Sequence, residues 1–293
     1  VGDQKHFWVT DEMIKEGNDE KVDIALGGIE GFESAIKSIL KSAELGYNIV
    51  GSDIAGFSGK TIPPRLYMRW TQFSAFCGLF MNGGHGERRL WKRTEEELEV
   101  IRKFSWLHTE LVPYMYHYVV TAHNGGRRLQ TVMKKGKYQY MFGDDYLVAP
   151  VYMDSKIREV FLPKGDWRYF FNDTELIPGG QTIQREFTMD EFPVFVKEGA
   201  IIPMNIERSY TNIGDKNSKG FTTILIYPKD ENSFTFYHTD TKGETKISYE
   251  FSNSENLEVK LEGKQIPHIL MIHSKFKPNK ITLDDIELQE NEN

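Results

Sequence analysis

The apolar positions of this chain change their spacing near residue 126, and this change divides the chain into two parts. Between residues 29 and 45 apolar side chains recur every three or four positions, which predicts an amphipathic helix that ends at Gly46. An apolar run, Tyr47–Val50, follows and leads into the segment GSDIAG at 51–56. A short apolar run that ends in a glycine-flanked aspartate predicts a buried strand that delivers the Asp53 carboxylate to the rim of a sheet.

A second unit of the same kind follows. The pattern predicts a helix over Arg65–Phe76, a short strand over Gly78–Met81 and a glycine-rich loop over Asn82–Arg89. The first part of the chain therefore delivers polar groups to a sheet rim twice in succession.

The longest helix is predicted from Glu95 to about His123. Thr94 can accept a hydrogen bond from the backbone amide of Glu97, whose side chain can reach back, so the two residues form a capping box at the start of this helix. Pro113 is expected to kink or split it, because proline lacks the amide proton that the helix interior needs.

From Arg127 onward short β-type runs follow one another with no helical pattern between them. The first group comprises Leu129–Met133, Tyr138–Phe142, Tyr146–Tyr152, Glu159–Leu162, Trp167–Phe171, Thr182–Phe187, Val194–Val196 and Ile201–Met204. After a polar linker at 205–218, the second group comprises Thr222–Tyr227, Ser233–Tyr237, Thr245–Phe251, Leu257–Leu261, His268–Ile272 and Lys280–Leu283. Two such groups predict two antiparallel β-sandwiches.

Composition and charge narrow the classes of partner. The 293 residues, 39% hydrophobic and 27% charged, suit a globular protein of two or three domains. A net charge of −7 without any basic tract argues against nucleic acid, and no apolar run approaches the roughly 20 residues of a membrane helix. The single cysteine, Cys77, excludes an intrachain disulfide and is expected to be a small buried hydrophobe.

Three histidines of the longest predicted helix suggest a metal site, but their spacing argues against one. His108, His117 and His123 are nine and six positions apart, so no two of them stack on one helical face. We therefore expect no metal and no cofactor.

At residues 51–59, GSDIAGFSG, the chain resembles glycoside hydrolase family 31, the retaining α-glycosidases that include α-glucosidases and α-xylosidases. The resemblance continues in the family's order through four further stretches. These are Arg69-Trp70, NGGHGER at 82–88, GDDYLVAP at 143–150, and FPVFV at 192–196 with Gly199-Ala200. The family uses the acidic pair Asp144-Asp145 for its fold, so the resemblance implies no catalytic role for it.

The resemblance implies which residues form the site. Asp3 matches the family's general acid/base, although from composition alone one aspartate near a terminus indicates a solvated carboxylate. Asp53 and His85 match positions that bind hydroxyl groups of the sugar next to the scissile bond, and Phe57 matches an aromatic wall. These residue types suit the task, because a carboxylate can accept from two vicinal hydroxyls and an imidazole can donate to one oxygen.

The resemblance also implies an α/β plus all-β architecture. Residues 1–126 would be the C-terminal third of a (β/α)8 barrel, 127–204 a proximal β-sandwich and 205–293 a distal one. Retaining hydrolysis needs two carboxyl groups about 5 Å apart, and the family's nucleophile lies on an earlier barrel strand that nothing here matches. The chain also opens at Val1 in mid-motif. We therefore expect a fragment whose partners are a carbohydrate substrate and the upstream N-terminal part of the same enzyme.

The leading expectation for the reaction is that of an exo-acting α-glucosidase. Gln4 stands where many members have asparagine, and Asn82-Gly83-Gly84 precedes His85 where many have an arginine nearby. An α-xylosidase, an α-galactosidase and a sulfoquinovosidase therefore stay open as alternatives. From a different class, two β-sandwiches could form a non-catalytic carbohydrate-binding protein. The compartment also stays open, with the periplasm and secretion among the alternatives.

Overall fold

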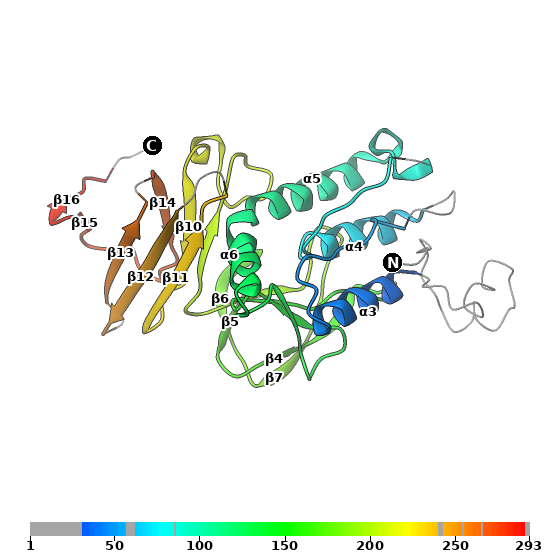
Figure 1. Ribbon diagram of the computed structural model, residues 1–293, viewed down its shortest axis with the longest axis horizontal. Coiled ribbons are helices and arrows are strands. Elements are labelled where there is room, and N and C mark those ends of the chain that lie inside the picture. The colour runs from blue at the N-terminus through cyan, green and yellow to red at the C-terminus, as the bar shows by residue number, and fades with distance from the viewer. Residues whose placement is uncertain are drawn as a thin grey trace, which may run out of the picture.

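The computed structural model describes residues 31–56, 62–84, 86–239, 243–253, 255–264 and 266–290. Helices occupy the first part and strands the second, as the sequence predicts (Figure 1). The helices are α3 (Gly31–Glu44), α4 (Pro64–Ser74), α5 (Glu95–Glu110) and α6 (Val112–His123), with short 3-10 turns η2 (Gly86–Arg88) and η3 (Leu90–Lys92). No helix within these ranges is long and apolar enough to cross a bilayer.

Helix α3 confirms the amphipathic helix predicted over residues 29–45. Its buried face carries Phe32, Ala35, Ile36, Ile39, Leu40 and Ala43. The helix gives way to a turn at Gly46, which has a φ of 101°, a left-handed conformation that glycine adopts without steric cost.

Where two strands were predicted after α3 and α4, the structure has no regular strand but one isolated parallel β-bridge, between Asp53 and Met81. The amide of Gly78 donates to the carbonyl of Val50 at 3.0 Å, and the amide of Ile54 donates to the carbonyl of Met81 at 2.9 Å. The prediction of regular strands over Tyr47–Val50 and Gly78–Met81 is therefore wrong, since so few backbone hydrogen bonds join the two segments and Tyr47 remains exposed.

Helices α5 and α6 confirm the predicted capping box and the predicted break. Thr94 accepts from the Glu97 amide, and the Glu97 side chain accepts from the Thr94 amide at 3.0 Å. The helix ends at Glu110, and α6 begins with Pro113 in its first turn, where proline's missing amide proton costs no hydrogen bond.

The first β-rich module holds nine strands. They are β1 (Gln130–Val132), β2 (Tyr140–Phe142), β3 (Tyr146–Val148), β4 (Ile157–Leu162), β5 (Asp166–Tyr169), β6 (Asn172–Pro178), β7 (Gln181–Glu186), β8 (Val194–Lys197) and β9 (Ile201–Met204). Six of them form one antiparallel sheet in the order β1-β2-β3-β8-β5-β6, and β4 pairs with β7. The sequence pattern missed β6, whose side chains are predominantly exposed and give no alternation to recognise.

The second β-rich module holds the remaining strands. They are β10 (Thr222–Ile226), β11 (Glu231–Tyr237), β12 (Glu244–Ser252), β13 (Asn256–Gly263), β14 (His268–Ile272), β15 (Thr282–Leu283) and β16 (Ile286–Glu287). One sheet has the order β11-β12-β13, and another has the order β14-β10-β9, so β9 pairs with the strand that follows the polar segment 205–218. The pairing of β10 with β14 is parallel, a departure from the antiparallel sheets predicted.

One hydrophobic core joins the helices to both groups of strands. Phe76 stacks on Phe192 with ring centroids 6.0 Å apart, and Tyr114 stacks on Phe234 at 5.7 Å. Helix α6 thus lies between the helical part and the second module (Figure 1). Cys77 is buried in this core, as predicted, and burial raises the pKa of its thiol.

The acidic pair Asp144-Asp145 is engaged within the fold. The Tyr114 hydroxyl donates to the Asp145 carboxylate at 3.1 Å, and Asp144 forms an ion pair with Arg127. Burial raises the pKa of Asp145 to about 7. The carboxylates fasten α6 to the turn between β2 and β3.

This raised pKa predicts a pH-dependent stability. In the unfolded chain Asp145 loses its proton near pH 4, whereas in the folded protein it keeps it up to about pH 7. The free energy of unfolding should therefore fall between about pH 4 and 7, by up to about 4 kcal/mol from this group, and stay level above. In Asp145→Asn, the Tm relative to wild type should rise progressively over this range. A Tm difference independent of pH, or one equal to that of the exposed-site control Asp284→Asn, would contradict the expectation.

Candidate functional site

The candidate site lies at the isolated β-bridge between the segments that follow α3 and α4. Asp53 forms the bridge to Met81, and its side chain is partly exposed. The chain turns immediately afterwards, since Ala55 has a φ of 59° and Gly56 one of 65°. Residues 51–56 therefore place one partly exposed carboxylate at the β-bridge, immediately before a sharp turn.

A residue of α4 holds Ser52, the residue before Asp53. The indole Nε1 of Trp70 donates to the Ser52 hydroxyl at 2.8 Å, and both side chains are buried. The Trp70 ring in turn packs against Phe32 of α3, with ring centroids 5.1 Å apart. The backbone next to Asp53 thus has little freedom to move.

Arg88 holds the turn after Asp53 from the other side. Its guanidinium is fully buried and donates to the carbonyls of Ala55, at 2.6 Å, and of Gly56. Because Arg88 belongs to the second rim segment, these bonds join loop 82–88 to the turn at 53–56.

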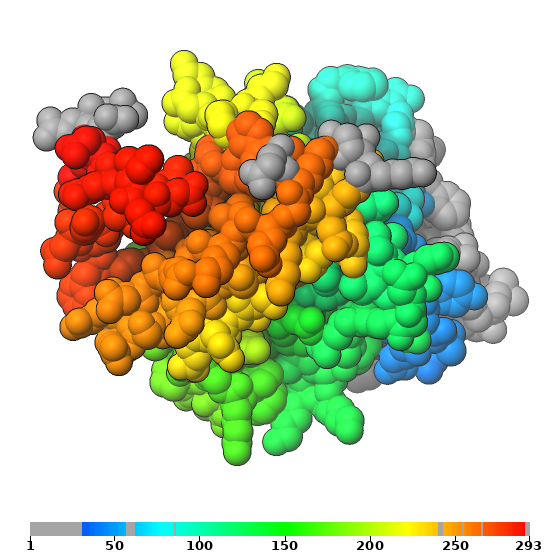
Figure 2. Space-filling model, turned by 60° about the vertical axis from the view of Figure 1, so that its left-hand side comes forward, coloured from blue at the N-terminus to red at the C-terminus, as the bar shows by residue number. Residues whose placement is uncertain are grey.

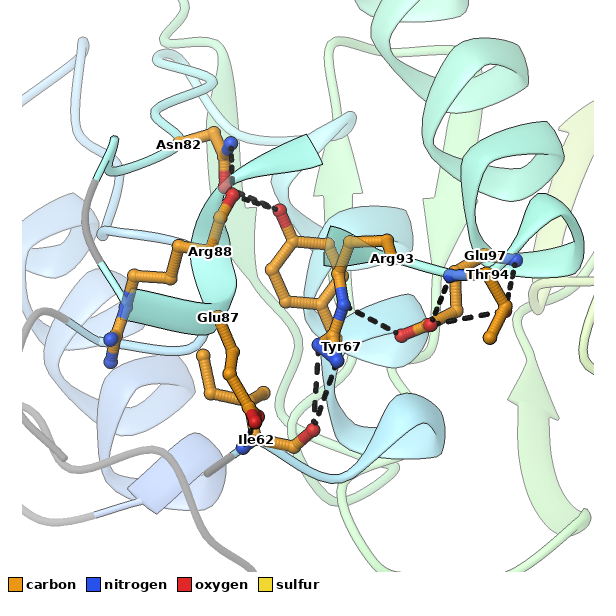
Figure 3. A network of polar contacts seen from close by, with 8 residues as sticks. All are labelled: Ile62, Tyr67, Asn82, Glu87, Arg88, Arg93, Thr94 and Glu97. Carbon is orange, nitrogen blue, oxygen red and sulfur yellow. Dashed lines mark hydrogen bonds and ion pairs between the residues drawn. The ribbon is translucent and has the colours of Figure 1, made fainter. Parts of the chain in front are cut away.

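Loop 82–88 is also closed upon itself by a network of side chains (Figure 3). The Tyr67 hydroxyl donates to the Asn82 side chain at 2.6 Å, and the Asn82 amide donates to the Arg88 carbonyl at 3.2 Å. Burial raises the pKa of Tyr67 to about 12, so its hydroxyl remains a donor at any physiological pH. Asn82 is therefore a loop-closing residue.

The same network continues to α5, as Figure 3 shows. The Glu87 carboxylate accepts from the amide of Ile62 at 2.6 Å, and Arg93 donates to the Ile62 carbonyl at 3.2 Å. Arg93 also forms an ion pair with Glu97, 3.2 Å apart, whose carboxylate completes the capping box. Glu87 and Arg93 therefore both hold the backbone of Ile62.

Of the four site residues predicted from the sequence, the structure places one. Asp53 forms the parallel bridge to Met81, and its role in the site stays a prediction. Asp3, Phe57 and His85 lie outside the described residues. Arg88, from the second predicted rim segment, reaches the turn after Asp53 through the carbonyls of Ala55 and Gly56.

Sequence reasoning missed Arg88, one of the residues that hold the turn after Asp53. Arg88 is part of the quoted stretch NGGHGER, yet no role was expected for it. The signal available was an arginine amid glycines next to an apolar strand, since a charged side chain there needs carbonyl or carboxylate partners. Arg69 is buried, and it donates to the carbonyls of Phe187 and Glu191, which ties α4 to the loop before β8.

Two of the histidines considered as metal ligands have backbone partners. The Nδ1 of His108 contacts the carbonyl of Ala75 at 3.1 Å, and that of His117 contacts the carbonyl of Thr235. Burial lowers the pKa of both rings. Within the part of the chain that the structure describes, no three His, Cys, Asp or Glu side chains gather to hold a metal ion.

Comparison with known families gives two matches. Residues 26–118 match the glycosyl hydrolases family 31 TIM-barrel domain, and residues 113–202 match the glycosyl hydrolase family 31 C-terminal domain. Both rim segments fall within the first match, and the strands β1 to β8 fall within the second.

Curated relatives and solved structures agree with these matches. A 1,6-α-glucosyltransferase of Sporosarcina globispora is 30% identical over 80% of this chain, and an α-xylosidase of Saccharolobus solfataricus is 29% identical over 65% of it. The cycloalternan-forming enzyme from Listeria monocytogenes, solved with a pentasaccharide substrate, is 29% identical over 89% of this chain, with a TM-score of 0.77. A dextranase of Flavobacterium johnsoniae, solved with glucose, is 27% identical over 88%, with a TM-score of 0.74.

The chain covers only part of these relatives. It spans 19% of the glucosyltransferase, 26% of the α-xylosidase, 27% of the cycloalternan-forming enzyme and 36% of the dextranase. The matched domains, their order along the chain and the rim built around Asp53 lead to one conclusion: this chain belongs to glycoside hydrolase family 31.

Proposed function

We propose that this chain is the C-terminal part of an exo-acting retaining α-glycosidase that acts on terminal α-linked sugars, with α-glucosides as its substrates. The observation that carries the proposal is Asp53, a partly exposed carboxylate at the β-bridge to Met81, with Trp70 and Arg88 fixing the backbone on either side of it. A carboxylate held in this way can accept hydrogen bonds from two vicinal sugar hydroxyls. Such bonds strengthen as the sugar distorts toward the transition state.

Asp3 is proposed as the general acid/base. Its acid form would protonate the departing glycosidic oxygen while a nucleophilic carboxylate attacks the anomeric carbon, and its base form would then activate the water that hydrolyses the glycosyl-enzyme. His85 would donate to a sugar oxygen, and Phe57 would contact the apolar face of the ring.

The nucleophile is proposed to come from an upstream part of the same enzyme. The relatives are roughly three to five times longer than the part that this chain matches. Three large apolar side chains shortly before Asp53 are exposed to solvent: Leu45, Tyr47 and Ile49. Further barrel strands would cover them. In this proposal residues 1–126 are the C-terminal third of the barrel, 127–204 the proximal β-sandwich and 205–293 the distal one, with β9 contributing to the sheet of the latter.

Two other functions remain candidates. The similarity to an α-xylosidase supports activity on α-xylosides, and the similarity to a 1,6-α-glucosyltransferase supports transfer to a sugar hydroxyl instead of water. Both use the same retaining chemistry, so they change the substrate or the acceptor and not the site. A non-catalytic carbohydrate-binding protein would bind sugars without turnover.

A panel of 4-nitrophenyl α-glycosides separates these possibilities. We expect the chain together with its upstream polypeptide to release 4-nitrophenol from the α-glucoside faster than from the galactoside, xyloside or N-acetylgalactosaminide. Isomaltose as an added acceptor would reveal transfer, through longer products on chromatography. Turnover by the isolated chain would refute the placement of the nucleophile, and no turnover of any glycoside by the two parts together would refute the proposal.

Asp3→Asn should separate the two chemical steps. We expect loss of hydrolysis of maltose-like substrates by at least about 10²-fold, because their leaving groups need protonation. The nitrophenyl glucoside should keep more of its first step, since 4-nitrophenolate leaves without an acid. The exposed-site control Asp284→Asn should behave as wild type. Wild-type rates on both substrates would show that Asp3 is not the acid/base.

A further inference from the structure

A cleft of about 720 Å³ lies along the side of α5, lined by other residues than those of the rim. Its walls are the exposed face of α5, the loop 188–190 between β7 and β8, and the loop 209–212 between β9 and β10. Figure 2 shows the segment around 205–220, in yellow, projecting at the top of the molecule. A volume of this size lies within the range of small-molecule sites.

Hydrogen bonds, one of them buried, hold the walls of this cleft. The Thr211 hydroxyl donates to the Glu110 carboxylate at 2.8 Å, and the Asn205 amide donates to the Glu110 carbonyl at 2.8 Å, which fastens the 205–212 segment to the end of α5. On the opposite wall Lys103 donates to the Asp190 carbonyl at 3.3 Å. A cleft that is formed before binding costs little ordering entropy when a ligand enters.

The charges of the lining cancel. Glu96, Glu99 and Asp190 face Arg102, Lys103 and Lys156. A strongly anionic ligand would meet three carboxylates and a strongly cationic one would meet three cations, so neither is favoured. The many donors and acceptors instead favour a neutral ligand with many hydroxyl groups, because each charged side chain can hydrogen-bond to a hydroxyl.

Tyr210 supplies the apolar surface that such a ligand needs. Its side chain is 40% exposed, and its ring lies 5.5 Å from the Arg102 guanidinium and 5.8 Å from the ring of Trp106. These contacts hold the ring in one orientation. A fixed aromatic ring amid hydrogen-bonding groups suits a sugar, which has apolar C–H faces and polar edges.

We propose that this cleft is a second, non-catalytic binding site for an α-linked oligosaccharide. The choice of α-linked sugars rests on the proposed function, whereas the preference for a neutral polyhydroxylated ligand rests on the cleft itself. Helix α5 connects the two places, because the rim network ends at its capping box and the cleft lines its side. The site would hold a remote segment of a polymeric substrate whose end enters the rim.

Affinity electrophoresis of the chain through native gels containing dextran or soluble starch tests this proposal. We expect at least one polymer to retard the chain relative to a non-binding marker protein, and Tyr210→Ala to weaken the binding on the order of tenfold, from the loss of the stacking surface. Tyr210→Phe should retain the retardation. Phe276→Ala, which removes an exposed aromatic ring elsewhere, is the matched control and should also retain it.

Asp53→Ala distinguishes this site from the rim. If the cleft binds the polymer, Asp53→Ala should be retarded like wild type while Tyr210→Ala is not. Absence of retardation by both polymers, or equal retardation of wild type and a folded Tyr210→Ala, would overturn the inference. Because retardation requires no turnover, failure of the nitrophenyl assay would count against the proposed function and leave this result interpretable.

Discussion

Asp53→Ala is expected to lower kcat/KM for the preferred aryl α-glycoside by roughly 10²- to 10⁴-fold, in the active enzyme that contains this chain. Two hydrogen bonds from sugar hydroxyls to a carboxylate are together worth about 3 to 6 kcal/mol when they are made in the transition state. The contacts that hold this turn come from Ser52, Trp70, Arg88 and the backbone, and alanine leaves all of them in place. The Tm should therefore change by no more than a few degrees.

Asp166→Asn is the control for this substitution. Its carboxylate pairs with Lys229, which lies between β10 and β11, at 2.7 Å, and loss of an exposed pair costs less than about 1 kcal/mol. We expect wild-type kinetics from it. A loss of less than fivefold in a folded Asp53→Ala, measured by initial rates over a range of substrate concentrations, would remove Asp53 from the site.

The substitution Gly51→Ala is expected to lower the free energy of unfolding by about 3 kcal/mol or more. In a domain of marginal stability, a loss of this size reduces the amount of folded protein that is recovered. A Cβ atom there would lie 2.3 Å from the carbonyl oxygen of Leu79 and 2.9 Å from its Cβ. The backbone of Leu79 cannot move aside as a flexible side chain can, so the segments that contain Gly51 and Leu79 would have to separate. Gly78 faces the same constraint, since its added Cβ would lie 2.8 Å from the Cα of Ile49.

Gly84→Ala is the matched control, because no atom lies within 4 Å of the Cβ that it would add. Urea unfolding of both variants compares them directly. We expect the midpoint of Gly84→Ala to stay near that of wild type and that of Gly51→Ala to fall by more than 1 M, at a typical slope of 1–3 kcal/mol per molar. Equal midpoints for the two variants would mean that these segments can relax around the added methyl group.

The sequence predicted those features of the fold that depend on local signals. The period of apolar residues gave α3, the pair Thr94 and Glu97 gave the start of α5, and Pro113 gave the break before α6. The parallel pairing of β10 with β14 was not predictable in the same way, because these strands are distant in sequence and alternation along a strand does not name its partner.

For the candidate site, too, the sequence carried local signals but did not reveal the contacts that form only in the tertiary fold. An apolar run that stops at a glycine-flanked aspartate predicted Asp53 at a strand end, whereas in the structure Asp53 forms an isolated parallel bridge to Met81. The partners of Arg88 and Trp70 could not be inferred, since they join segments that only the tertiary fold brings together. The roles of Asp3, Phe57 and His85 stay predictions from family resemblance.

The pairing of β9 with β10 has a consequence for the order in which this protein is made. Strand β9 leaves the ribosome before β10, and β10 leaves it well before its other neighbour, β14. At synthesis rates of roughly 5–20 residues per second, the backbone edge of β9 waits on the order of seconds for its partner, with its donors and acceptors unpaired. During that interval the nascent chain exposes backbone donors and acceptors of β9 that pair with β10 in the folded protein.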